Sequence, residues 1–342
     1  MKKDSRRGVI AAGTWILDMG KRIDHWPEPE TLALIEEVVP TNGGAAFNVA
    51  CDLARLDPSL PVRGIGLIGA DGPGDTILEM CASLGIDTSG LERLTEAPTS
   101  FTDVMTERGS GRRTFFHAPG ANVHLDESRV CIDAEDSGIF FLGYLGLLPG
   151  LDEPGPDGVN GSARLFQKAS AAGLMTAADL VSAPNDRLAV QVVPCLPHLD
   201  ILFANEWEAS RLLGAPLEPG TEISFLRAAE MARGIRALGL RGQAVVHFAG
   251  GAVCAEPDGS CHGLGAVRVP PEEIVGTTGA GDAFASGFLV GTLHGGDSAL
   301  ELAVCAAAVS LGSLTCSDAI APADTCLARG RERGFSTPMH SL

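Results

Sequence analysis

A glycine-rich turn near the end of the chain, residues 276–284 (GTTGAGDAF), has the composition of an anion site. Glycines let a ligand approach the backbone and leave N–H groups unpaired, and the positive end of a following helix favours a phosphoryl group. Gly279, Ala280 and Gly281 would supply those amides. Asp282 follows them, although a carboxylate does not help to bind phosphate. We interpret Asp282 as a general base for an attacking hydroxyl; an N-cap aspartate is the alternative.

A second polar pair follows the apolar strand expected at Ile201–Ala204. Asn205 and Glu208 are three residues apart and share a helix face, at the strand end where open α/β sheets bind their ligands. An amide and a carboxylate so placed could hold the water ligands of Mg²⁺. An ordinary capping box at a helix start is an equally good interpretation.

A third turn, Thr41–Asn48, carries two adjacent glycines before an expected helix. Gly43 and Gly44 would let a polyol lie against the backbone, and Asn48 can both donate and accept hydrogen bonds. Asp18, expected at the end of the first strand, could accept hydrogen bonds from two hydroxyls. Each feature alone is more often a simple turn.

Residues 64–69 match the pattern G-x-G-x-x-G of dinucleotide-binding proteins. That fingerprint requires a helix to begin within it. Here Asp71–Gly74 is expected to delay the helix until Asp75. We therefore interpret the match as accidental, and the chain has no Walker A sequence.

The elements that position these turns alternate along the chain, with continuous apolar strands. This order predicts a mostly parallel sheet covered by helices on both faces. We expect strands at Val9–Ile16, Val62–Ile68, Ile139–Leu142, Leu174–Asp179, Ile201–Ala204 and Gln243–Phe248, and helices at Asn48–Leu56, Asp75–Leu84, Ser162–Ala172, Glu206–Leu213, Ile223–Leu238, Asp282–Leu293 and Leu300–Leu311.

Two segments, residues 19–42 and about 98–120, do not follow the alternation of strands and helices. The pattern of the second segment predicts a hairpin with its turn at Gly109-Ser110-Gly111. We expect them to form a small β-sheet lid on a single domain that spans residues 1–342. The lid carries Arg112, Arg113 and His117, which could contact an anionic substrate. Its exposed edges favour a homodimer.

Composition limits the function further. The 342 residues carry 25 Lys+Arg against 43 Asp+Glu, a net charge of −18. Such a charge disfavours nucleic-acid partners and anionic membranes. Nine cysteines without a C-x-x-C pair are typical of a reduced, cytoplasmic protein. Cys254, Cys261 and His262 have the wrong spacing for zinc and indicate a hairpin around Pro257–Gly259.

In this order, the motifs resemble those of the ribokinase-like (PfkB) carbohydrate kinase family. The resemblance covers roughly residues 8–325 and rests on TTGAGDAF at 277–284, G-G-x-x-x-N-x-A at 43–50, G-x-x-G-x-D-x-x-G at 66–74 and N-x-x-E at 205–208. It implies a three-layer αβα fold with a small β-sheet lid. It also implies transfer of the ATP γ-phosphate to a hydroxyl of a sugar, sugar acid or related polyol.

The resemblance also assigns residues. It implies that Asp282 is the base, that Gly279, Ala280 and Gly281 form the anion hole, and that the cofactors are ATP and Mg²⁺. Asn205 and Glu208 would organise the Mg²⁺ ion near the phosphates through water. Thr278 and His247 would lie along the nucleotide. The acceptor would contact Asp18, Gly43, Gly44 and Asn48, with Arg113 from the lid.

The chain departs from the family pattern at several positions. Gly276 replaces an Asp that in many members helps to bind a monovalent cation, so potassium dependence stays open. His247-Phe248-Ala249 replaces Thr-Leu-Gly at the nucleotide edge. Ala45 and Ile16 replace Lys and Asn of ribokinase-type members, which counts against ribose as the acceptor. The role of Tyr144, the single tyrosine, is undecided.

Three other functions stay open at this stage. A nucleoside kinase of the same fold would stack its base on aromatic side chains, for which Trp15, Phe47 and Phe116 are available. A catalytically silent sugar-binding protein would have no need of Asp282. An NAD(P)-dependent oxidoreductase would depend only on the glycines at 64–69.

Overall fold

The computed structural model describes residues 7–109, 112–183, 186–218, 220–295 and 298–342. They include a ten-stranded sheet in which seven parallel strands are followed by three antiparallel ones. The predicted mostly parallel sheet is thus confirmed. From one edge to the other the strands are β5 (Asp87–Leu94), β4 (Val62–Gly69), β1 (Gly8–Gly13), β8 (Ser137–Leu145), β9 (Met175–Leu180), β10 (Ile201–Asn205), β11 (Gln243–Phe248), β12 (Gly251–Ala255), β13 (Cys261–Gly265) and β14 (His340–Ser341).

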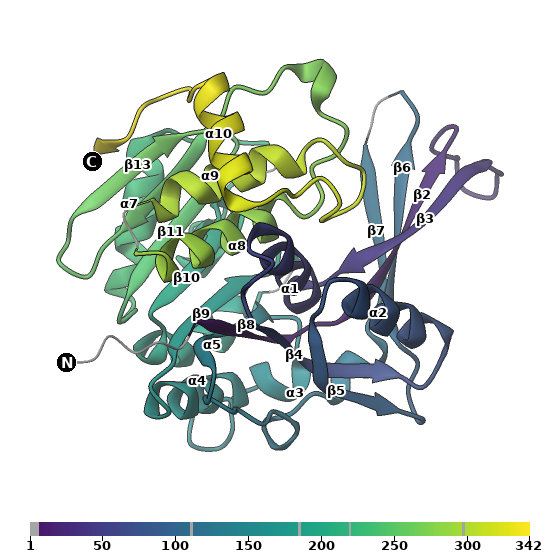
Figure 1. Ribbon diagram of the computed structural model, residues 1–342, viewed down its shortest axis with the longest axis horizontal. Coiled ribbons are helices and arrows are strands. Elements are labelled where there is room, and N and C mark those ends of the chain that lie inside the picture. The colour runs from purple at the N-terminus through teal and green to yellow at the C-terminus, as the bar shows by residue number, and fades with distance from the viewer. Residues whose placement is uncertain (1–6, 110–111, 184–185, 219, 296–297) are drawn as a thin grey trace.

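Helices cover both faces of this sheet, which gives three layers (Figure 1). Successive side chains of β1 point to opposite faces of the sheet and so enter two different cores. Val9 and Ala11 belong to one core, and Ile10 and Ala12 belong to the other. The first core includes residues of α1 (Ala45–Leu56), α2 (Gly72–Ser83), α8 (Ala280–Leu293), α9 (Ala299–Ser310) and α10 (Ala323–Arg333). The second includes residues of α3 (Pro149–Asp152), α4 (Gly161–Ala171), α5 (Leu188–Val192), α6 (Glu206–Leu212) and α7 (Phe225–Ala237).

The smaller sheet contains four strands and stands out beside the large one (Figure 1). Its order is β3 (Ile35–Gly43), β2 (Ile16–Ile23), β6 (Ser100–Glu107) and β7 (Arg113–Ala118). The antiparallel pair β6–β7 is the predicted hairpin. Of its predicted turn, Ser110 and Gly111 lie outside the described residues.

The single strand predicted at Val9–Ile16 is wrong. β1 ends at Gly13, whose φ of 126° suits glycine, and the Thr14 amide then donates to the Gly143 carbonyl at 2.8 Å. The chain leaves the large sheet there and enters the small sheet as β2. Asp18 therefore lies inside a lid strand and not at the end of the first strand.

The glycines of the G-x-G-x-x-G match make room for a tryptophan. They lie within β4, and a Cβ at Gly64 or Gly66 would come within 2.5 or 2.2 Å of the Trp15 ring. That ring is fully buried and donates from Nε1 to the Ile65 carbonyl at 3.0 Å. The predicted delay of the next helix is wrong, because α2 begins at Gly72, with Asp71 as its N-cap.

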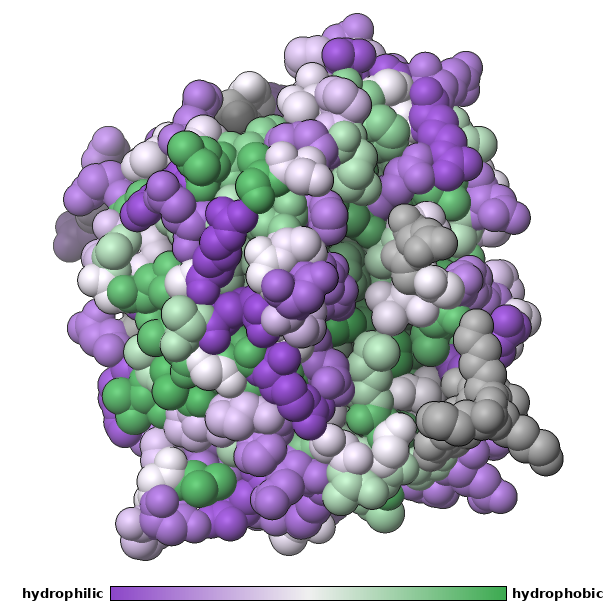
Figure 2. Space-filling model, turned by 90° about the vertical axis from the view of Figure 1, so that its left-hand side faces the viewer, coloured by the Kyte–Doolittle hydropathy of each residue, from purple (hydrophilic) through white to green (hydrophobic). Residues whose placement is uncertain are grey.

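The strands β12 and β13 form the hairpin predicted around Pro257–Gly259. Cys254 and Cys261 are buried in it, and the described part of the chain holds no His/Cys/Asp/Glu cluster that could bind a metal directly. Among the same residues, no helix is long and apolar enough to cross a membrane. On the face drawn in Figure 2, hydrophilic side chains are interspersed with smaller hydrophobic patches.

Candidate active site

A groove at the carboxyl ends of the parallel strands faces the small sheet. Most of the residues singled out from the sequence line it, although they come from distant segments. They are Asp18, Gly44, Asn48, His117, Asn205, Glu208, His247, Thr278, Gly279, Ala280, Gly281 and Asp282. Gly43 and Arg113 do not line this groove but lie next to it, as described below.

Asp282 occupies the first turn of α8 and is 3% exposed. Its Oδ2 accepts a hydrogen bond from Asn48 Nδ2 at 2.8 Å, and the Tyr144 hydroxyl donates to both carboxylate oxygens. Burial raises the pKa of Asp282 to about 6, while the two hydrogen bonds work in the opposite direction. Such a carboxylate is largely ionised at neutral pH yet basic enough to take a proton.

The alternative interpretation of Asp282 as an N-cap is wrong. Gly279 is the N-cap of α8, in a left-handed conformation with φ 78°. A Cβ at this position would also lie 2.8 Å from the Cys316 backbone. Both the left-handed conformation and the lack of space therefore require glycine here. The Gly281 and Asp282 amides have no hydrogen-bond acceptor among the described residues, as expected for a helix N-terminus. They are therefore free to bind an anion.

Asn48 is held in place by a chain of polar side chains behind it. Its Oδ1 accepts a hydrogen bond from Asn42 Nδ2 at 2.7 Å, and Asn42 Nδ2 also donates to Ser317 Oγ at 2.8 Å. All three residues are buried. The contact fixes the orientation of the Asn48 amide, so that its nitrogen faces Asp282.

Asp18 projects from β2 and packs against Gly43 of the neighbouring strand. A Cβ at Gly43 would lie 2.2 Å from Asp18 Oδ1, so only glycine leaves room for this carboxylate. Burial raises the pKa of Asp18 to about 7; a hydrogen bond from Thr102 lowers it and the charge of Asp282 raises it further. The carboxylates of Asp18 and Asp282 thus share one groove.

Asn205 and Glu208 form the capping box considered as the alternative to a metal site. Asn205 Oδ1 accepts from the Glu208 amide and Glu208 Oε2 accepts from the Asn205 amide, each at 2.9 Å. Ser182 Oγ donates to Glu208 Oε1 at 2.6 Å. Both residues still line the groove, so the cap and a ligand-facing position coexist.

The donor set here suits a hydrated magnesium ion. Asp179, at the end of β9, is buried beside Glu208, and its Oδ1 accepts from the Leu180 amide. Burial raises the pKa of Asp179 well above its usual range, and the charges of Glu208 and Asp282 raise it further. Burial also raises the pKa of Glu208 to about 7, where the charges of Asp282 and Glu206 act in the same direction. A cation would relieve this crowding of acids. Since most of their oxygens already accept hydrogen bonds, the residues fit an ion that keeps its own waters.

His247, at the end of β11, lies beside the amide turn. A Cβ at Gly281 would be 3.4 Å from its Cε1, and its ring centroid is 5.1 Å from that of Phe284. Burial lowers the pKa of His247 to about 4. The ring is therefore neutral at neutral pH and adds no positive charge to the groove.

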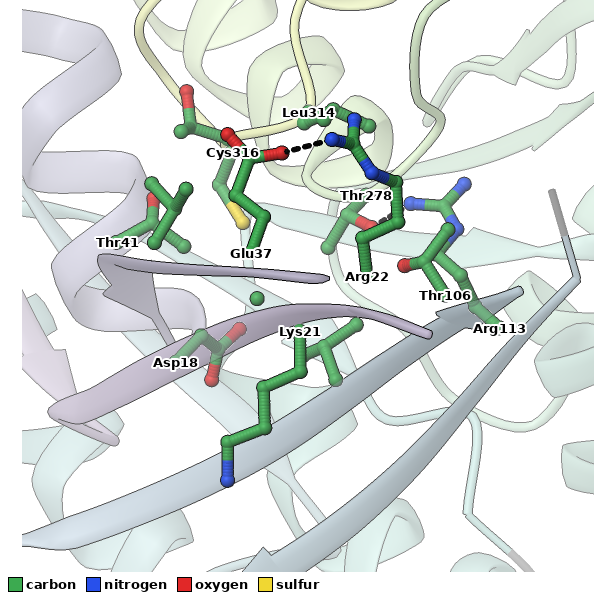
Figure 3. A pocket seen from close by; sticks show the side chains of 14 residues that line it. Asp18, Lys21, Arg22, Glu37, Thr41, Thr106, Arg113, Thr278, Leu314 and Cys316 are labelled. Carbon is green, nitrogen blue, oxygen red and sulfur yellow. Dashed lines mark hydrogen bonds and ion pairs between the residues drawn. The ribbon is translucent and has the colours of Figure 1, made fainter. Parts of the chain in front are cut away.

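Arg113 of β7 reaches across from the small sheet to the turn before α8. Its Nη1 and Nη2 donate to the hydroxyls of Thr278 and Thr277. It lines a second pocket, which adjoins the first at Asp18 and Thr278 (Figure 3). In this pocket Arg22 is paired with Glu37, whereas the Lys21 side chain points away from it and pairs with Asp103 at 2.6 Å.

Sequence reasoning missed two residues that line the groove, Tyr144 and Asp179, and two that lie behind Asn48, Asn42 and Ser317. Tyr144 had no assigned role, and Asp179, Asn42 and Ser317 were not considered. Tyr144 and Asp179 each lie at the carboxyl end of an apolar strand, at the edge of the sheet where ligands bind. That position was the signal that could have found them.

Comparison with known proteins identifies the family of the chain. The family model for the pfkB family carbohydrate kinases matches residues 16–326. An ATP-dependent ribose-1-phosphate kinase of Halopiger xanaduensis is 28% identical over 89% of this chain and 92% of its own length. A nucleoside kinase of Methanothermobacter thermautotrophicus is 26% identical over 85% and 84%.

Solved structures share the fold. The ribokinase of Arabidopsis thaliana, complexed with ribose and ATP, superimposes with a TM-score of 0.76 at 21% identity, over 94% of this chain and 98% of that one. The nucleoside kinase of Methanocaldococcus jannaschii gives a TM-score of 0.72 at 18% identity, over 95% and 98%. With the family model matched over most of its length, the chain belongs to the pfkB family of carbohydrate kinases.

Proposed function

We propose that this kinase transfers the γ-phosphate of ATP to a hydroxyl of a sugar, sugar acid or related polyol. One observation carries the proposal: the buried Asp282 carboxylate opens into the same groove as Asp18 and Asn48, at the start of α8, where the amides of Gly281 and Asp282 have no acceptor among the described residues. A proton acceptor and an anion site are thus adjacent. Phosphoryl transfer to an alcohol needs both.

In the proposed reaction, the acceptor oxygen attacks the γ-phosphorus in line with the bond to the β,γ-bridging oxygen. A new O–P bond forms and the old one breaks, and ADP leaves with the electron pair. The hydroxyl proton goes to Asp282. The amides of Gly279, Ala280 and Gly281, together with that of Asp282, would bind the equatorial oxygens of the transferring group. The Ala280 amide would exchange its 3.4 Å bond to the Thr277 carbonyl for this contact.

The nucleotide would extend from Thr278 and residues 279–281 past His247. Asn205, Glu208 and Asp179 would hold Mg²⁺ through its water ligands, and the ion would neutralise charge on the phosphates. This arrangement is supported by the buried carboxylates that line the groove, since none of the described lining residues is Lys or Arg. A monovalent cation is not required by the proposal. Gly276 leaves no room for an acidic side chain, since a Cβ would lie 2.5 Å from the Ser313 carbonyl oxygen.

The acceptor would lie under the small sheet, and the segments at about 19–42 and 98–120 that form this sheet would act as a lid. Asp18 would accept hydrogen bonds from the hydroxyls of the acceptor, and the backbone of Gly44 would line one side. Gly43 would contribute by leaving room for the Asp18 carboxylate. Arg113 would face it from the lid. A relative that phosphorylates ribose 1-phosphate, by its name, makes sugar phosphates a natural group of acceptors to test.

A nucleoside is the second candidate acceptor, and Phe115 is the observation that favours it. Phe115 lines the groove and is 56% exposed, so its ring could stack on a base. The aromatic residues first considered for this role do not suit it. Trp15 and Phe47 are fully buried and stack on each other, and Phe116 stacks on Trp26.

The test is an ADP-release screen with Mg-ATP over sugars, sugar acids, sugar phosphates and nucleosides, with and without potassium. We expect turnover with one of the first three classes that needs no potassium. Nucleoside-dependent turnover alone would favour the second candidate. Binding of sugars without any ADP release, under conditions where ATP binds, would show a silent binding protein and contradict the proposal.

We also propose that two copies pair through the lid. Because Phe115 lines the groove, its neighbour Phe116 lies on the opposite face of the sheet. That outer face exposes Val38, Phe101 and Phe116 by 49, 39 and 52%. Exposed apolar faces of this kind favour association. Sedimentation of the wild type and of Phe116→Asp should show a dimer and a monomer; a monomeric wild type would refute the pairing.

A further inference from the structure

A buried carboxyl behind the groove has no role in the reaction proposed above. Asp52, on α1, is fully buried, and among the described residues neither of its oxygens has a hydrogen-bond partner. Arg55, whose charge acts on it, bonds instead to Asp318 at 2.8 Å. A buried acid without a partner destabilises a fold, so its presence next to an active site calls for a functional explanation.

Asp52 lies behind the amide that contacts the base. Asn48 and Asp52 are four residues apart on α1 and therefore share one face of that helix. Helix α8, which carries Asp282, packs beside α1 (Figure 1), and Asn48 Nδ2 donates to the Asp282 carboxylate at 2.8 Å. The charge of Asp282 also raises the pKa of Asp52. The two acids therefore interact, although Asp52 does not line the groove.

Two buried side chains, Asn42 and Ser317, connect Asn48 with the surroundings of Asp52. Asn42 Nδ2 donates to Asn48 Oδ1 at 2.7 Å and to Ser317 Oγ at 2.8 Å. The Thr41 hydroxyl donates to Asn42 Oδ1 at 3.2 Å, so every polar atom of the Asn42 amide is in use. If this amide turned over, its oxygen would meet the Asn48 oxygen unless Asn48 turned as well. The orientation of Asn48 therefore depends on where Ser317 directs its own proton.

The Ser317 hydroxyl has a single proton, which cannot point at Asn42. Because Ser317 Oγ accepts a hydrogen bond from Asn42, its proton must go to another group. Ser317 lowers the pKa of the Asp52 carboxyl, as a donor pointing at it does. Among the described residues, Ser317 Oγ donates to no other acceptor. A carboxyl offers an accepting oxygen whether or not it is protonated, so Asp52 can fill this place at any pH.

We propose that Asp52 is a positioning residue for phosphoryl transfer: it accepts the Ser317 proton and so fixes, through Asn42, the orientation in which Asn48 donates to Asp282. The proposal rests on the proposed function, in which Asp282 is the base. Without Asp52 the Ser317 proton would turn toward Asn42, and the two amides would turn over in sequence. The Asn48 oxygen would then face the Asp282 carboxylate, which would lose a donor and become harder to ionise.

The other ionisable groups around Asp52 do not compete for this role. Arg55 is paired with Asp318, and burial raises the pKa of each neighbouring thiol, so that these thiols stay neutral near neutral pH. The thiols are those of Cys51 on the same helix, Cys316 in the loop before Ser317, and Cys326 on α10. Among the described groups, Asp282 is thus the other acid that titrates against Asp52.

The pH–kcat profile separates a positioning role from a purely structural one. We would measure it for the wild type, Asp52→Leu, Ser317→Ala and Asp52→Asn, with Mg-ATP and the acceptor found in the screen. Asp52→Leu removes the accepting oxygen and Ser317→Ala removes the link, so both should move the acidic limb up by about one pH unit or more. Asp52→Asn keeps an accepting oxygen and should retain the wild-type limb. A purely structural role would lower the melting temperature and leave every limb in place.

Ser286→Ala is the matched control for Ser317→Ala. Ser286 is also a fully buried serine, on α8, but its hydroxyl has no hydrogen-bond partner among the described residues, so the variant should keep the wild-type profile. If Asp52→Leu does not fold, Ser317→Ala decides. An unmoved limb in a folded Asp52→Leu or Ser317→Ala overturns the proposal, and so does an Asp52→Asn limb that moves as far as that of Asp52→Leu.

A second measurement does not depend on turnover. Carbon-13 NMR of the aspartate carboxyl carbons follows the titration of Asp282 directly, and Asp282→Asn assigns its signal. The Asp282 titration should shift upward in Asp52→Leu and Ser317→Ala and stay in place in Asp52→Asn. If the wild type releases ADP with no acceptor, the proposed function fails, and the NMR titrations still decide whether Asp52 orients Asn48. Unshifted titrations refute the proposal even in an active enzyme.

Discussion

The Tyr144 hydroxyl donates to both oxygens of the Asp282 carboxylate, at 2.8 and 2.9 Å, across 138 residues of sequence. Burial raises the pKa of Tyr144 well above its usual range, so the phenol keeps its proton at any pH suitable for assay. It therefore always acts as a donor. Together with Asn48 it opposes the effect of burial on Asp282 and keeps the pKa of that carboxyl at about 6.

This relationship predicts a pH dependence. The base must be ionised, so the kcat of the wild type should rise through pH 6 and become constant above about pH 7. Tyr144→Phe removes a hydrogen bond to a charged group, worth about 1.5–3 kcal/mol, and should move the acidic limb up by about one pH unit or more. The pH–kcat profiles of both proteins measure this. If the acidic limb of the pH–kcat profile were unchanged in Tyr144→Phe, Asp282 would not be the group whose ionisation that limb reports.

Asp282→Asn should lower kcat by about 10²–10⁴-fold, the usual contribution of a general base. The amide is nearly isosteric and removes a buried acid, so the melting temperature should not fall at pH 8. Asp75→Asn is a suitable control, because Asp75 also lies in the first turn of a helix but is exposed. Near-normal turnover in Asp282→Asn would remove this residue from the mechanism.

Much of the architecture could be predicted because it depends on local pattern. The apolar runs at Val62–Ile68 and Gln243–Phe248 are strands in the structure, and the glycine-rich turn at 276–282 does lead into a helix. The order of the motifs added the family, and with it the αβα layers and the small sheet. These features need no knowledge of which segments meet in space.

What could not be predicted depends on contacts between distant residues. β1 stops at Gly13 because Thr14 bonds to Gly143, and no local signal separates Val9–Gly13 from Ile16. Asn42 and Ser317 meet behind Asn48 although 275 residues separate them. The pairing of Arg113 with Thr277 and Thr278 likewise depends on where the lid sits. Each of these contacts is specified by tertiary packing alone.

Burial of Asp52 should make the free energy of unfolding depend on pH in an unusual direction. It is fully buried on α1, and neither carboxylate oxygen has a hydrogen-bond partner among the described groups. Burial raises the pKa of Asp52 well above its usual range, although the nearby Ser317 hydroxyl works to lower it. A pKa raised by folding means that stability is greatest below the unfolded-state value and falls as pH rises toward the folded-state value.

Asp52→Asn should therefore stabilise the protein at pH 8, by on the order of 1–3 kcal/mol, and flatten this part of the pH dependence. Asp57→Asn is the opposite control. Burial works to raise the pKa of Asp57, but hydrogen bonds from Ser59 and from His294 lower it overall. Its contribution is present at neutral pH, so Asp57→Asn should destabilise there. Denaturant unfolding at pH 5 and pH 8 tests both; a less stable Asp52→Asn at pH 8 would contradict the interpretation.

The glycines of β4 lead to a final prediction, which also separates the kinase from the oxidoreductase. At Gly66 an added Cβ would lie 2.2 Å from Trp15 Cδ1 and 2.8 Å from the Gly13 carbonyl oxygen, so Gly66→Ala should destabilise the fold by about 1–3 kcal/mol. At Gly72 nothing lies within 4 Å, and Gly72→Ala should leave the stability unchanged or slightly higher. Thermal unfolding compares the two. Calorimetric titration of the wild type should show binding of ATP and no binding of NADH. The reason is that Gly64 and Gly66 accommodate an indole ring and leave no free surface for a pyrophosphate. If the wild type bound NADH and Gly66→Ala abolished that binding, a dinucleotide site would be supported instead.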